Sequence, residues 1–231
     1  MIITVTNTKG GTGKSNLSSH LAIWLYERGI KVALLDADHD QGTSSTWLKL
    51  AEPAIPVAVA GTPQEIKTKL KELSQTNQVV VADTPGSASN AAFTATLLAD
   101  IAIVPLQPSD SDVWAIDKAL QAINVAREAT DGKRPETFIV LTSTAVRDVQ
   151  ARNLRAQLEA NLPYRIARSE IRRLFAFRAA SGKSVTRMKG ADARKAQADL
   201  NALFCEVLGG KLPGIEVTDN SNDRIRRVVN D

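Results

Sequence analysis

The sequence predicts an α/β fold, with a parallel, doubly wound β-sheet and helices on both faces. Short apolar runs rich in β-branched residues alternate with longer segments of helical spacing. A glycine-rich turn directly follows the first of these runs. The chain has 231 residues, 43% of them hydrophobic, and its single cysteine allows no internal disulfide. Strands that alternate with helices in this way are joined by right-handed crossovers, which makes them parallel.

The expected elements follow one another in a regular order. Apolar runs predict strands at residues 2–6, 32–35, 79–82, 101–104, 138–141 and 163–167. Helical spacing predicts helices over residues 15–28, 63–74, 88–98, 111–129, 148–160 and 192–207. The first helix has apolar residues along one face, and Gly29 is placed to end it. Ligands of such sheets bind at the carboxyl ends of the strands, which makes loops 7–15, 36–43 and 83–88 the candidate functional loops.

The loop after the first strand has the composition of a phosphate-binding turn. Gly10, Gly11 and Gly13 allow successive backbone N–H groups to close around a phosphate chain at the positive end of a helix dipole. In such a loop Lys14 reaches the β- and γ-phosphates, and the hydroxyl of Ser15 ligates Mg²⁺. The expected nucleotide-binding residues are Lys9, Gly10, Gly11, Thr12, Gly13, Lys14, Ser15 and Asn16.

The stretch TKGGTGKS departs from the strict phosphate-loop pattern, because Thr8 stands where that pattern has glycine. It resembles the deviant Walker A motif, K-G-G-x-G-K-[ST], of the ParA/MinD class of P-loop ATPases. The resemblance implies ATP and Mg²⁺ as cofactors and catalytic roles for Lys9 and Lys14. It also implies an ATP-dependent homodimer in which Lys9 contacts the phosphates held by the partner subunit. A cation supplied in this way neutralises phosphate charge only when two ATP-loaded subunits meet.

Acidic residues follow the second strand in the stretch LLDADHDQGTSS. A buried, unpaired carboxylate is costly, so Asp36 and Asp38 are expected to hold a metal ion or a water, or else to cap the next segment. The stretch resembles the D-x-D-P-Q-G motif of ParA relatives, which implies that Asp38 orients the attacking water and that Asp36 lies near the Mg²⁺. His39 and Asp40 stand where the motif has one proline, so Asp40 remains the alternative to Asp38.

The third strand ends in the stretch VVVADTPGSAS, where Asp83 has the position of a Walker B aspartate that holds Mg²⁺. The following T-P-G is also a good turn, but here it resembles the family's D-x-P-G/P switch, whose amides sense the γ-phosphate. The stretch VPLQPSDSDVWA resembles the family's V-P-x-x-P-S-x-x-S segment. Many relatives use an asparagine after the fifth strand to read the base, and Thr142 or Ser143 is expected to replace it here.

Positive charge is concentrated in one part of the chain. The net charge is +4, yet residues 165–195 hold ten lysines and arginines and two acidic residues, a local charge of +8. Such a segment is either a surface that meets a polyanion or a solvated, arginine-rich helix face. It is similar to the region where partition ATPases contact DNA without sequence preference. That similarity implies DNA contacts by Arg172, Arg173, Arg178, Lys183, Arg187 and Lys189.

The resemblance runs from residue 1 to about residue 205 and is closest to the short ParA-type partition ATPases. It predicts one P-loop ATPase domain over residues 1–210, followed by a polar tail over 211–231. The expected protein is cytoplasmic and nucleoid-associated when ATP-bound, without membrane attachment, because no apolar run is long enough to span a bilayer. Its ATP-bound sandwich dimer would coat DNA, and a ParB-like adaptor would stimulate hydrolysis and release, which positions plasmid or chromosome cargo.

Two other functions remain open at this stage. The same ATPase cycle could position a protein cargo, such as a microcompartment, a chemoreceptor cluster or a conjugation apparatus. Alternatively, the chain could be an enzyme of small-molecule metabolism on the same nucleotide fold. The remaining notable side chains are expected to be structural: His20, Trp24, Trp47, Trp114 and Cys205.

Overall fold

The computed structural model describes residues 1–212, apart from the side chains of residues 110–115. All but the first two residues of the expected polar tail, and the side chain of Trp114, therefore lie outside the described part. The strands are β1 (Ile2–Val5), β2 (Val32–Asp36), β3 (Val57–Val59), β4 (Val79–Asp83), β5 (Ile101–Leu106), β6 (Glu136–Thr144), β7 (Arg165–Ile166) and β8 (Ile171–Arg172). They pair in parallel in the order β3-β2-β4-β1-β5-β6-β7, and β8 pairs with β6 further along that strand. The expected parallel sheet is confirmed.

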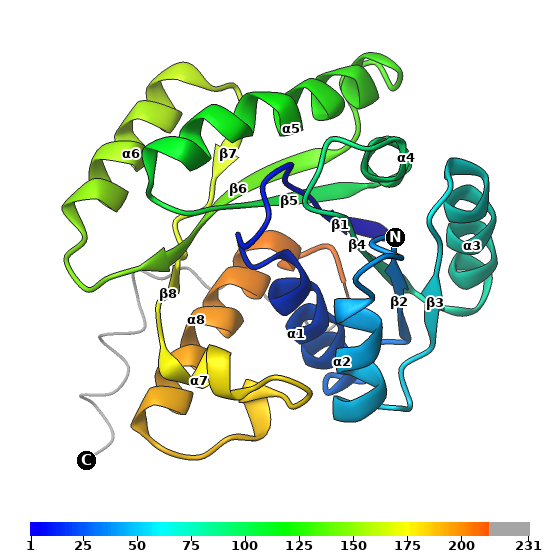
Figure 1. Ribbon diagram of the computed structural model, residues 1–231, viewed down its shortest axis with the longest axis horizontal. Coiled ribbons are helices and arrows are strands. Elements are labelled where there is room, and N and C mark those ends of the chain that lie inside the picture. The colour runs from blue at the N-terminus through cyan, green and yellow to red at the C-terminus, as the bar shows by residue number, and fades with distance from the viewer. Residues whose placement is uncertain (213–231) are drawn as a thin grey trace.

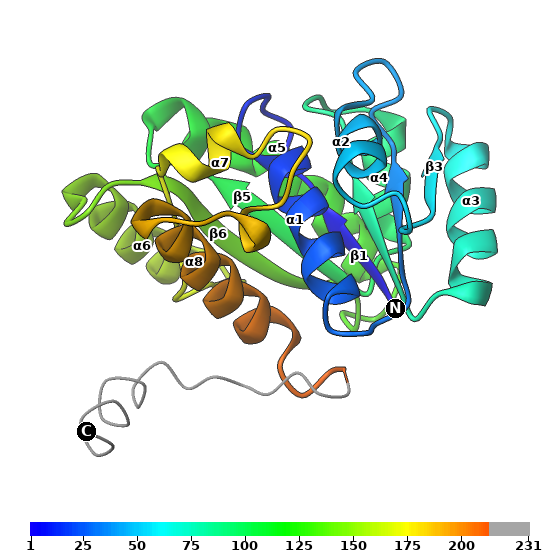
Figure 2. The same cartoon turned by 90° about the horizontal axis from the view of Figure 1, so that it is seen from below.

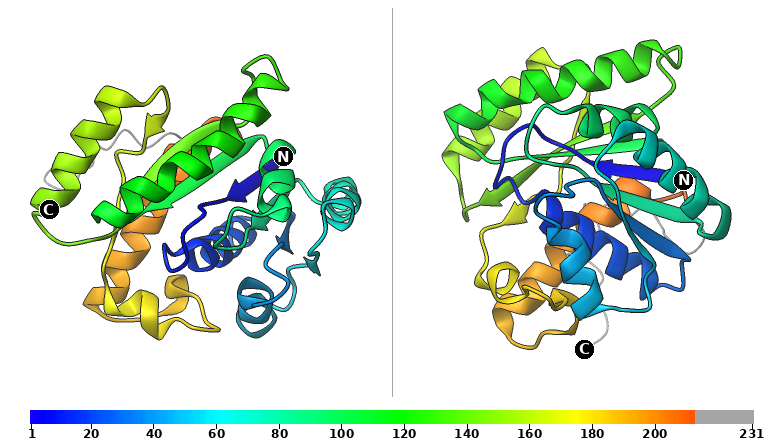
Figure 3. Two further views of the ribbon diagram at one scale, coloured as in Figure 1. Left: turned by 45° about the horizontal axis from the view of Figure 1, so that its top comes forward. Right: turned by 45° about the vertical axis from the view of Figure 1, so that its right-hand side comes forward.

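Helices cover both faces of this sheet (Figure 1). One face carries α1 (Lys14–Tyr26), α2 (Thr43–Ala51), α7 (Phe175–Ala179) and α8 (Ala191–Leu208), which lie in front of the strands in Figure 2. The other carries α3 (Pro63–Thr76), α4 (Asn90–Leu97), α5 (Asp110–Glu128) and α6 (Val149–Asn161), and Figure 3 shows α5 and α6 lying over the strands. Within residues 1–212, none of the helices combines the length and the apolar composition that a membrane crossing requires.

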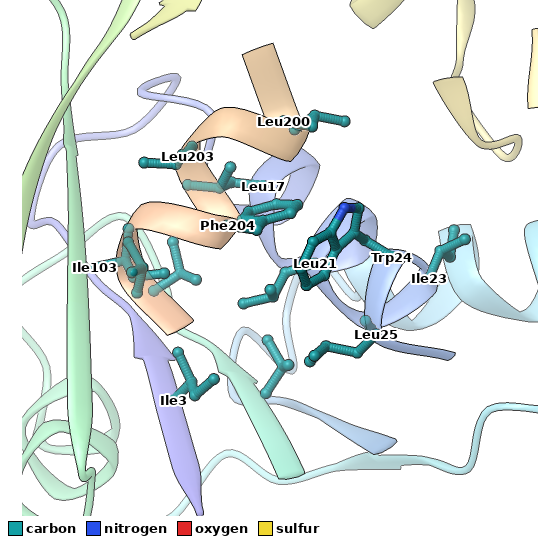
Figure 4. Close-up of a cluster of buried hydrophobic side chains, with 14 of the residues drawn as sticks. Ile3, Leu17, Leu21, Ile23, Trp24, Leu25, Ile103, Leu200, Leu203 and Phe204 are labelled. Carbon is teal, nitrogen blue, oxygen red and sulfur yellow. The ribbon is translucent and has the colours of Figure 1, made fainter. Parts of the chain in front are cut away.

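The central helix α1 is buried on all sides, which its expected one-sided apolar face does not explain. Every residue from Leu17 to Leu25 is buried, because α8 packs beside α1 on the same face of the sheet while Trp47 of α2, Phe177 of α7 and the main chain of Val185 contact His20. Figure 4 shows Leu200, Leu203 and Phe204 of α8 packed beside Leu17 and Trp24 of α1. Gly29 ends the helix region with a φ of 75°, as expected. Trp24, Trp47 and Cys205 are buried packing residues, also as expected.

Three short elements were absent from the sequence-based prediction. Helix α2, of nine residues, begins in a run of polar residues that hides its apolar face, and the edge strand β3 has three residues. Strand β8 has two residues and exists only because it pairs with the end of β6. Elements this short depend on tertiary contacts, so their sequence pattern is weak.

Candidate functional site

The three candidate loops meet at one edge of the sheet, because β1, β2 and β4 are neighbours. Strand β4 lies between β2 and β1, so Asp83 is in register with Asp36 on one side and with Val5 on the other. Both aspartates are the last residues of their strands, and both are completely buried. The phosphate loop leaves the adjoining end of β1. The order of the strands thus places two carboxylates beside the glycine-rich turn.

Three polar side chains, one of them in the loop itself, hold the phosphate loop in shape. Asn7 accepts a hydrogen bond from the backbone N–H of Lys9 at 3.1 Å and donates to the carbonyl of Pro105 at 2.7 Å. Gln107 donates to the carbonyl of Gly11 at 2.8 Å, and Thr142 donates to the carbonyl of Thr12 at 3.1 Å. The bonds from Gln107 and Thr142 engage loop carbonyls, so they do not compete with an anion for the loop N–H groups.

The sequence analysis did not single out Asn7 or Gln107. The position of Asn7, a polar residue between a buried strand and a glycine-rich turn, could have indicated its role in shaping the loop. Gln107 lies 96 residues from the carbonyl that it contacts, and no local pattern connects the two positions. Thr142 and Ser143 were the alternatives expected to read the base; both line the cavity beside the phosphate loop, and the buried hydroxyl of Thr142 donates to the carbonyl of Thr12.

The ammonium group of Lys14 lies within the phosphate loop. Its Nζ donates to the carbonyl of Lys9 at 2.9 Å, so the first lysine of the motif positions the second through its main chain. Burial lowers the pKa of Lys14, and the carboxylates of Asp83 and Asp38 partly offset this effect. A buried cation beside backbone amides is a site for a strongly anionic group such as a triphosphate.

One oxygen of Asp83 is free to take a metal ion. Ser18 donates to its Oδ1 at 3.1 Å, whereas Oδ2 has no hydrogen-bond partner among the described residues. Burial raises the pKa of this carboxyl to about 6, although the nearby Ser15 hydroxyl acts to lower it. No cluster of three or more His, Cys, Asp or Glu side chains suited to a metal occurs within the described part of the chain. These residues fit Mg²⁺ held jointly by protein oxygens and nucleotide phosphates, as Mg²⁺ usually is.

Replacing Asp83 with asparagine is expected to stabilise the nucleotide-free protein while it weakens Mg²⁺-dependent nucleotide binding. The pKa of about 6 in the folded protein lies above the ordinary value of 3.8, so ionisation at neutral pH opposes folding, and this cost disappears as the pH falls toward 4. Asparagine keeps an acceptor for Ser18 and carries no charge. The free energy of unfolding at pH 7.5 should rise by about 1–3 kcal/mol in urea melts. A less stable variant would contradict this expectation.

The acidic residues after β2 have different environments. Asp36 accepts the backbone N–H of Asp38 at 3.1 Å and that of Ser45 at 2.8 Å, so its two oxygens fix the turn and the start of α2. Asp38 is half-buried, and its charge acts on Lys14. The side chain of Asp40 is 88% exposed, and its Oδ1 lies 3.0 Å from the Nδ1 of His39. Of the two alternatives, Asp38 is the one that the fold brings to the phosphate loop.

The loop after β4 touches the phosphate loop at Gly86. A Cβ atom at this position would lie 2.9 Å from the Cα of Gly10 and 3.3 Å from the Nζ of Lys14. Two stretches of main chain can approach this closely only without a side chain between them. The expected γ-phosphate switch, 84–86, is therefore in direct contact with the turn that would hold the phosphates.

The substitution Gly86→Ala is expected to separate these two loops and to lower ATP affinity at least tenfold. The added methyl group meets main chain at Gly10, which cannot move aside as a flexible side chain would. Titration with a fluorescent ATP analogue measures the effect. Gly132→Ala is the control for a strained glycine replacement away from the site, since it lies in the turn after α5 with a φ of 75° and its added Cβ would have only the guanidinium of Arg127 nearby, at 3.9 Å. Equal affinities of the wild type and Gly86→Ala would contradict the close-contact argument.

A cavity of about 500 Å³ opens beside the phosphate loop. Its walls come from Gly11 to Gly13, the end of β6 at Thr142 and Ser143, and the segment from β8 to α7 that includes Phe177 and Arg178. Ser143 has a φ of 56°, in the left-handed region. A cavity of this size and position suits a small organic group attached to the phosphates.

The six expected DNA-contacting residues fall into two groups. Arg172 bonds to Asp199 through Nε at 3.0 Å, and Arg187 bonds to Glu27 through Nε at 3.0 Å and also pairs with Glu52. These carboxylates neutralise both arginines and raise their pKa. The other four residues, Arg173, Arg178, Lys183 and Lys189, are exposed.

Comparison with known proteins agrees with this site. The sequence matches the CobQ/CobB/MinD/ParA nucleotide binding domain over residues 3–185. It is 30% identical over 214 residues to "Maintenance of carboxysome distribution protein A" of Halothiobacillus neapolitanus, covering 89% of this chain and 95% of that protein. It is 28% identical over 163 residues to "Protein ParA" of Rhizobium radiobacter, covering 69% of this chain and 73% of that protein.

A solved structure shares the fold. The septum site-determining protein MinD of Pyrococcus horikoshii, complexed with Mg-ADP, superposes with a TM-score of 0.67 at 19% sequence identity, covering 87% of this chain and 93% of that one. Nucleotide and magnesium thus occur together in a protein of this fold. The matched segment of 183 residues contains the phosphate loop, both buried aspartates and the Gly86 loop. This chain belongs to the CobQ/CobB/MinD/ParA family of nucleotide-binding proteins.

Proposed function

We propose that the protein is an ATP-dependent partition ATPase whose ATP-bound dimer binds DNA without sequence preference. The observation that carries the proposal is the meeting of the phosphate loop, the unpaired oxygen of Asp83 and the main chain of Gly86 at one point. This arrangement supports a triphosphate with Mg²⁺ as the ligand. The cavity beside the loop then takes the nucleoside, with Ser143 facing the base and Thr142 holding the loop.

Each residue has one task in the proposed reaction. The loop amides and Lys14 bind and orient the phosphates, and Ser15 and Asp83 would hold Mg²⁺, which would neutralise phosphate charge. The carboxylate of Asp38 positions a water in line with the γ-phosphate. The loop at Gly86 contacts the phosphate loop at Gly10. Its main-chain amides respond to the presence or absence of the γ-phosphate. Lys9 completes the phosphate site of a second subunit.

Two matched variants distinguish Asp38 from Asp40 as the residue that orients the attacking water. Asp38→Ala is expected to bind ATP normally and to lose at least 100-fold in the rate of phosphate release, because loss of a positioned base typically costs about 10²–10⁴-fold. Asp40→Ala removes an exposed carboxylate two residues away and should hydrolyse ATP at nearly the wild-type rate. The reverse pattern would assign the water to Asp40.

DNA is the favoured polyanion because four of the six residues expected to contact it remain as exposed cations after the paired Arg172 and Arg187 are set aside. Arg173, Arg178, Lys183 and Lys189 can each release a counterion from the DNA backbone. Contacts of this kind add affinity without sequence information. Two copies of this surface in an ATP dimer would bind DNA more tightly than one copy. The affinity for DNA would therefore depend on the bound nucleotide. A ParB-like adaptor that stimulates hydrolysis would then release the DNA.

A second candidate is the same cycle with a protein assembly as cargo. It is favoured by the similarity, over nearly the whole chain, to a protein named for carboxysome distribution. The two candidates share the ATP switch and the DNA surface and differ only in what the adaptor carries. Purification of the adaptor from cells with crosslinking would separate them, since it retains either a DNA site or an assembly of proteins.

The test is a DNA-retention assay with ATP, ADP or no nucleotide over a range of salt concentrations. ATP alone should produce retention of unrelated DNA sequences. The double variant Lys183→Gln/Lys189→Gln should lower affinity at least tenfold and reduce the salt slope by about two. The control Lys67→Gln/Lys71→Gln removes two exposed lysines from α3 on the other face of the sheet. Retention that is equal with all nucleotides, or equal in both double variants, would overturn the proposal.

A further inference from the structure

A buried aromatic cluster joins the nucleotide loops to the basic segment. The ring of His20, on α1, meets the rings of Trp47 and Phe177 edge-on, with centroids 5.4 Å and 6.0 Å apart. Trp47 belongs to α2 and Phe177 to α7. Figure 2 shows the yellow segment after α7 running alongside α1, and in Figure 1 it also reaches α2. The part of the basic segment in question is residues 180–190, which carries Lys183 and Lys189.

His20 connects α1 to the segment through both ring nitrogens. Its Nδ1 lies 2.8 Å from the carbonyl of Asn16, and its Nε2 lies 3.2 Å from the backbone nitrogen of Val185. Since a backbone N–H can only donate, Nε2 is the acceptor and the proton resides on Nδ1. The ring is therefore neutral and oriented by its two partners. Burial, which lowers the pKa of His20 to about 4, keeps it neutral.

Two further bonds join the same elements. The indole N–H of Trp47 donates to the carbonyl of Lys183 at 2.8 Å. The side-chain amide of Asn16 donates to the carbonyl of Phe177 at 3.3 Å. Gly182 also lies against α2, because a Cβ there would be 3.1 Å from the Cδ1 of Leu50. The main chain on both sides of Lys183 is therefore held by α1 and α2.

Both helices start in the nucleotide site. Helix α1 begins at Lys14, and Asn16 is its third residue. Helix α2 is attached to the site by the bond from the N–H of Ser45 to Asp36, and Trp47 follows two residues later. A change at the phosphates that shifts either helix start is passed through a rigid helix to the main chain of residues 183–185.

We propose that His20 and Trp47 are positioning residues that make the conformation of the basic segment depend on the nucleotide. The inference rests on the proposed function and adds the physical link between its two sites. The bonds hold the main chain of Lys183 and Val185 and leave the Lys183 side chain exposed for a ligand. Nucleotide binding and DNA binding are then coupled, and the coupling is reciprocal.

Four variants of the full chain separate coupling from folding. His20→Leu removes both ring hydrogen bonds, and His20→Gln supplies one donor and one acceptor in their place. Trp47→Phe removes the N–H donor and some ring volume and keeps an aromatic ring. The control is Ser19→Ala, next to His20 on α1, whose buried hydroxyl has no hydrogen-bond partner within the described residues.

Amide hydrogen exchange of residues 180–190, followed by mass spectrometry with ATP and with ADP, is the test. In the wild type and Ser19→Ala, exchange of this segment should differ at least threefold between the two nucleotides. In His20→Leu and Trp47→Phe the difference should fall below half of the wild-type value, and His20→Gln should restore part of it. Peptides of the phosphate loop should respond to ATP in every variant. The inference would be overturned if exchange of residues 180–190 in His20→Leu differed between ATP and ADP as much as in the wild type. If His20→Leu does not fold, the same result in Trp47→Phe would overturn it.

DNA affinity then distinguishes the two proposals. The ratio of DNA dissociation constants in ADP and ATP should fall at least fivefold in His20→Leu, with unchanged ATP affinity. Absence of DNA binding by the wild type would refute the proposed function, yet a His20-dependent exchange response would still support the coupling. Absence of any nucleotide-dependent exchange in the wild-type segment would refute the coupling, even where DNA is bound.

Discussion

Lys14→Ala is expected to abolish nucleotide binding, with at least a 100-fold increase in the dissociation constant for ATP. The Lys14 ammonium group lies inside the phosphate loop, 2.9 Å from the carbonyl of Lys9, and the residue is only 6% exposed. A hydrogen bond to a charged group contributes about 1.5–3 kcal/mol, and an ammonium can make two such bonds to a triphosphate. Their loss corresponds to about 10²–10⁴-fold in affinity.

Calorimetric titration with ATP and Mg²⁺ measures this effect directly. A thermal melt of the variant establishes that the protein is folded, since Lys14 also faces Asp83 and Asp38. The control Lys31→Ala removes an exposed lysine that precedes β2, at the opposite end of the strands. An ATP affinity within tenfold of the wild type would show that the phosphates bind elsewhere.

Lys9→Ala is expected to spare ATP binding and to remove the ATP-dependent dimer. The proposed contact of Lys9 is with phosphates of the second subunit, so the monomer has nothing to lose in ATP affinity beyond about threefold. By symmetry each dimer contains two such contacts, together worth about 3–6 kcal/mol. The dimer dissociation constant should therefore increase at least 100-fold.

Sedimentation at several protein concentrations, with ATP and Asp38→Ala as the hydrolysis-deficient background, measures the dimer. The main-chain role of Lys9 is kept in the variant, because its N–H bonds to Asn7 and its carbonyl accepts from Lys14 in either case. Lys31→Ala again controls for a lost positive charge. Dimers that persist in Lys9→Ala would refute the role in trans, and a large loss of ATP affinity would assign Lys9 to its own nucleotide.

The candidate site was predictable where its residues are local in sequence. The phosphate loop is one continuous turn, and Asp36 and Asp83 end two apolar strands, so composition and order suffice to identify them. The choice between Asp38 and Asp40 was left open, because an exposed turn has no periodic pattern. The fold brings Asp38 to Lys14 and leaves Asp40 on the surface.

The basic segment shows what composition misses. Its charge of +8 counts Arg172 and Arg187 as available cations. In the structure Arg172 pairs with Asp199, 27 residues away, and Arg187 with carboxylates 160 and 135 residues away. Net charge in a window cannot reveal such partners, since they enter from other elements.

By itself, the sequence determined the parallel α/β architecture, the phosphate loop and the two strand-ending aspartates, because hydrophobic period and turn chemistry act over a few neighbouring residues. Only the tertiary structure decided that α8 packs beside α1, that Gln107 and Thr142 shape the phosphate loop, and that His20 meets Trp47 and the segment of Lys183. Those contacts join residues far apart in the chain. Their geometry follows from the strand order and the packing of helices, which no local pattern contains.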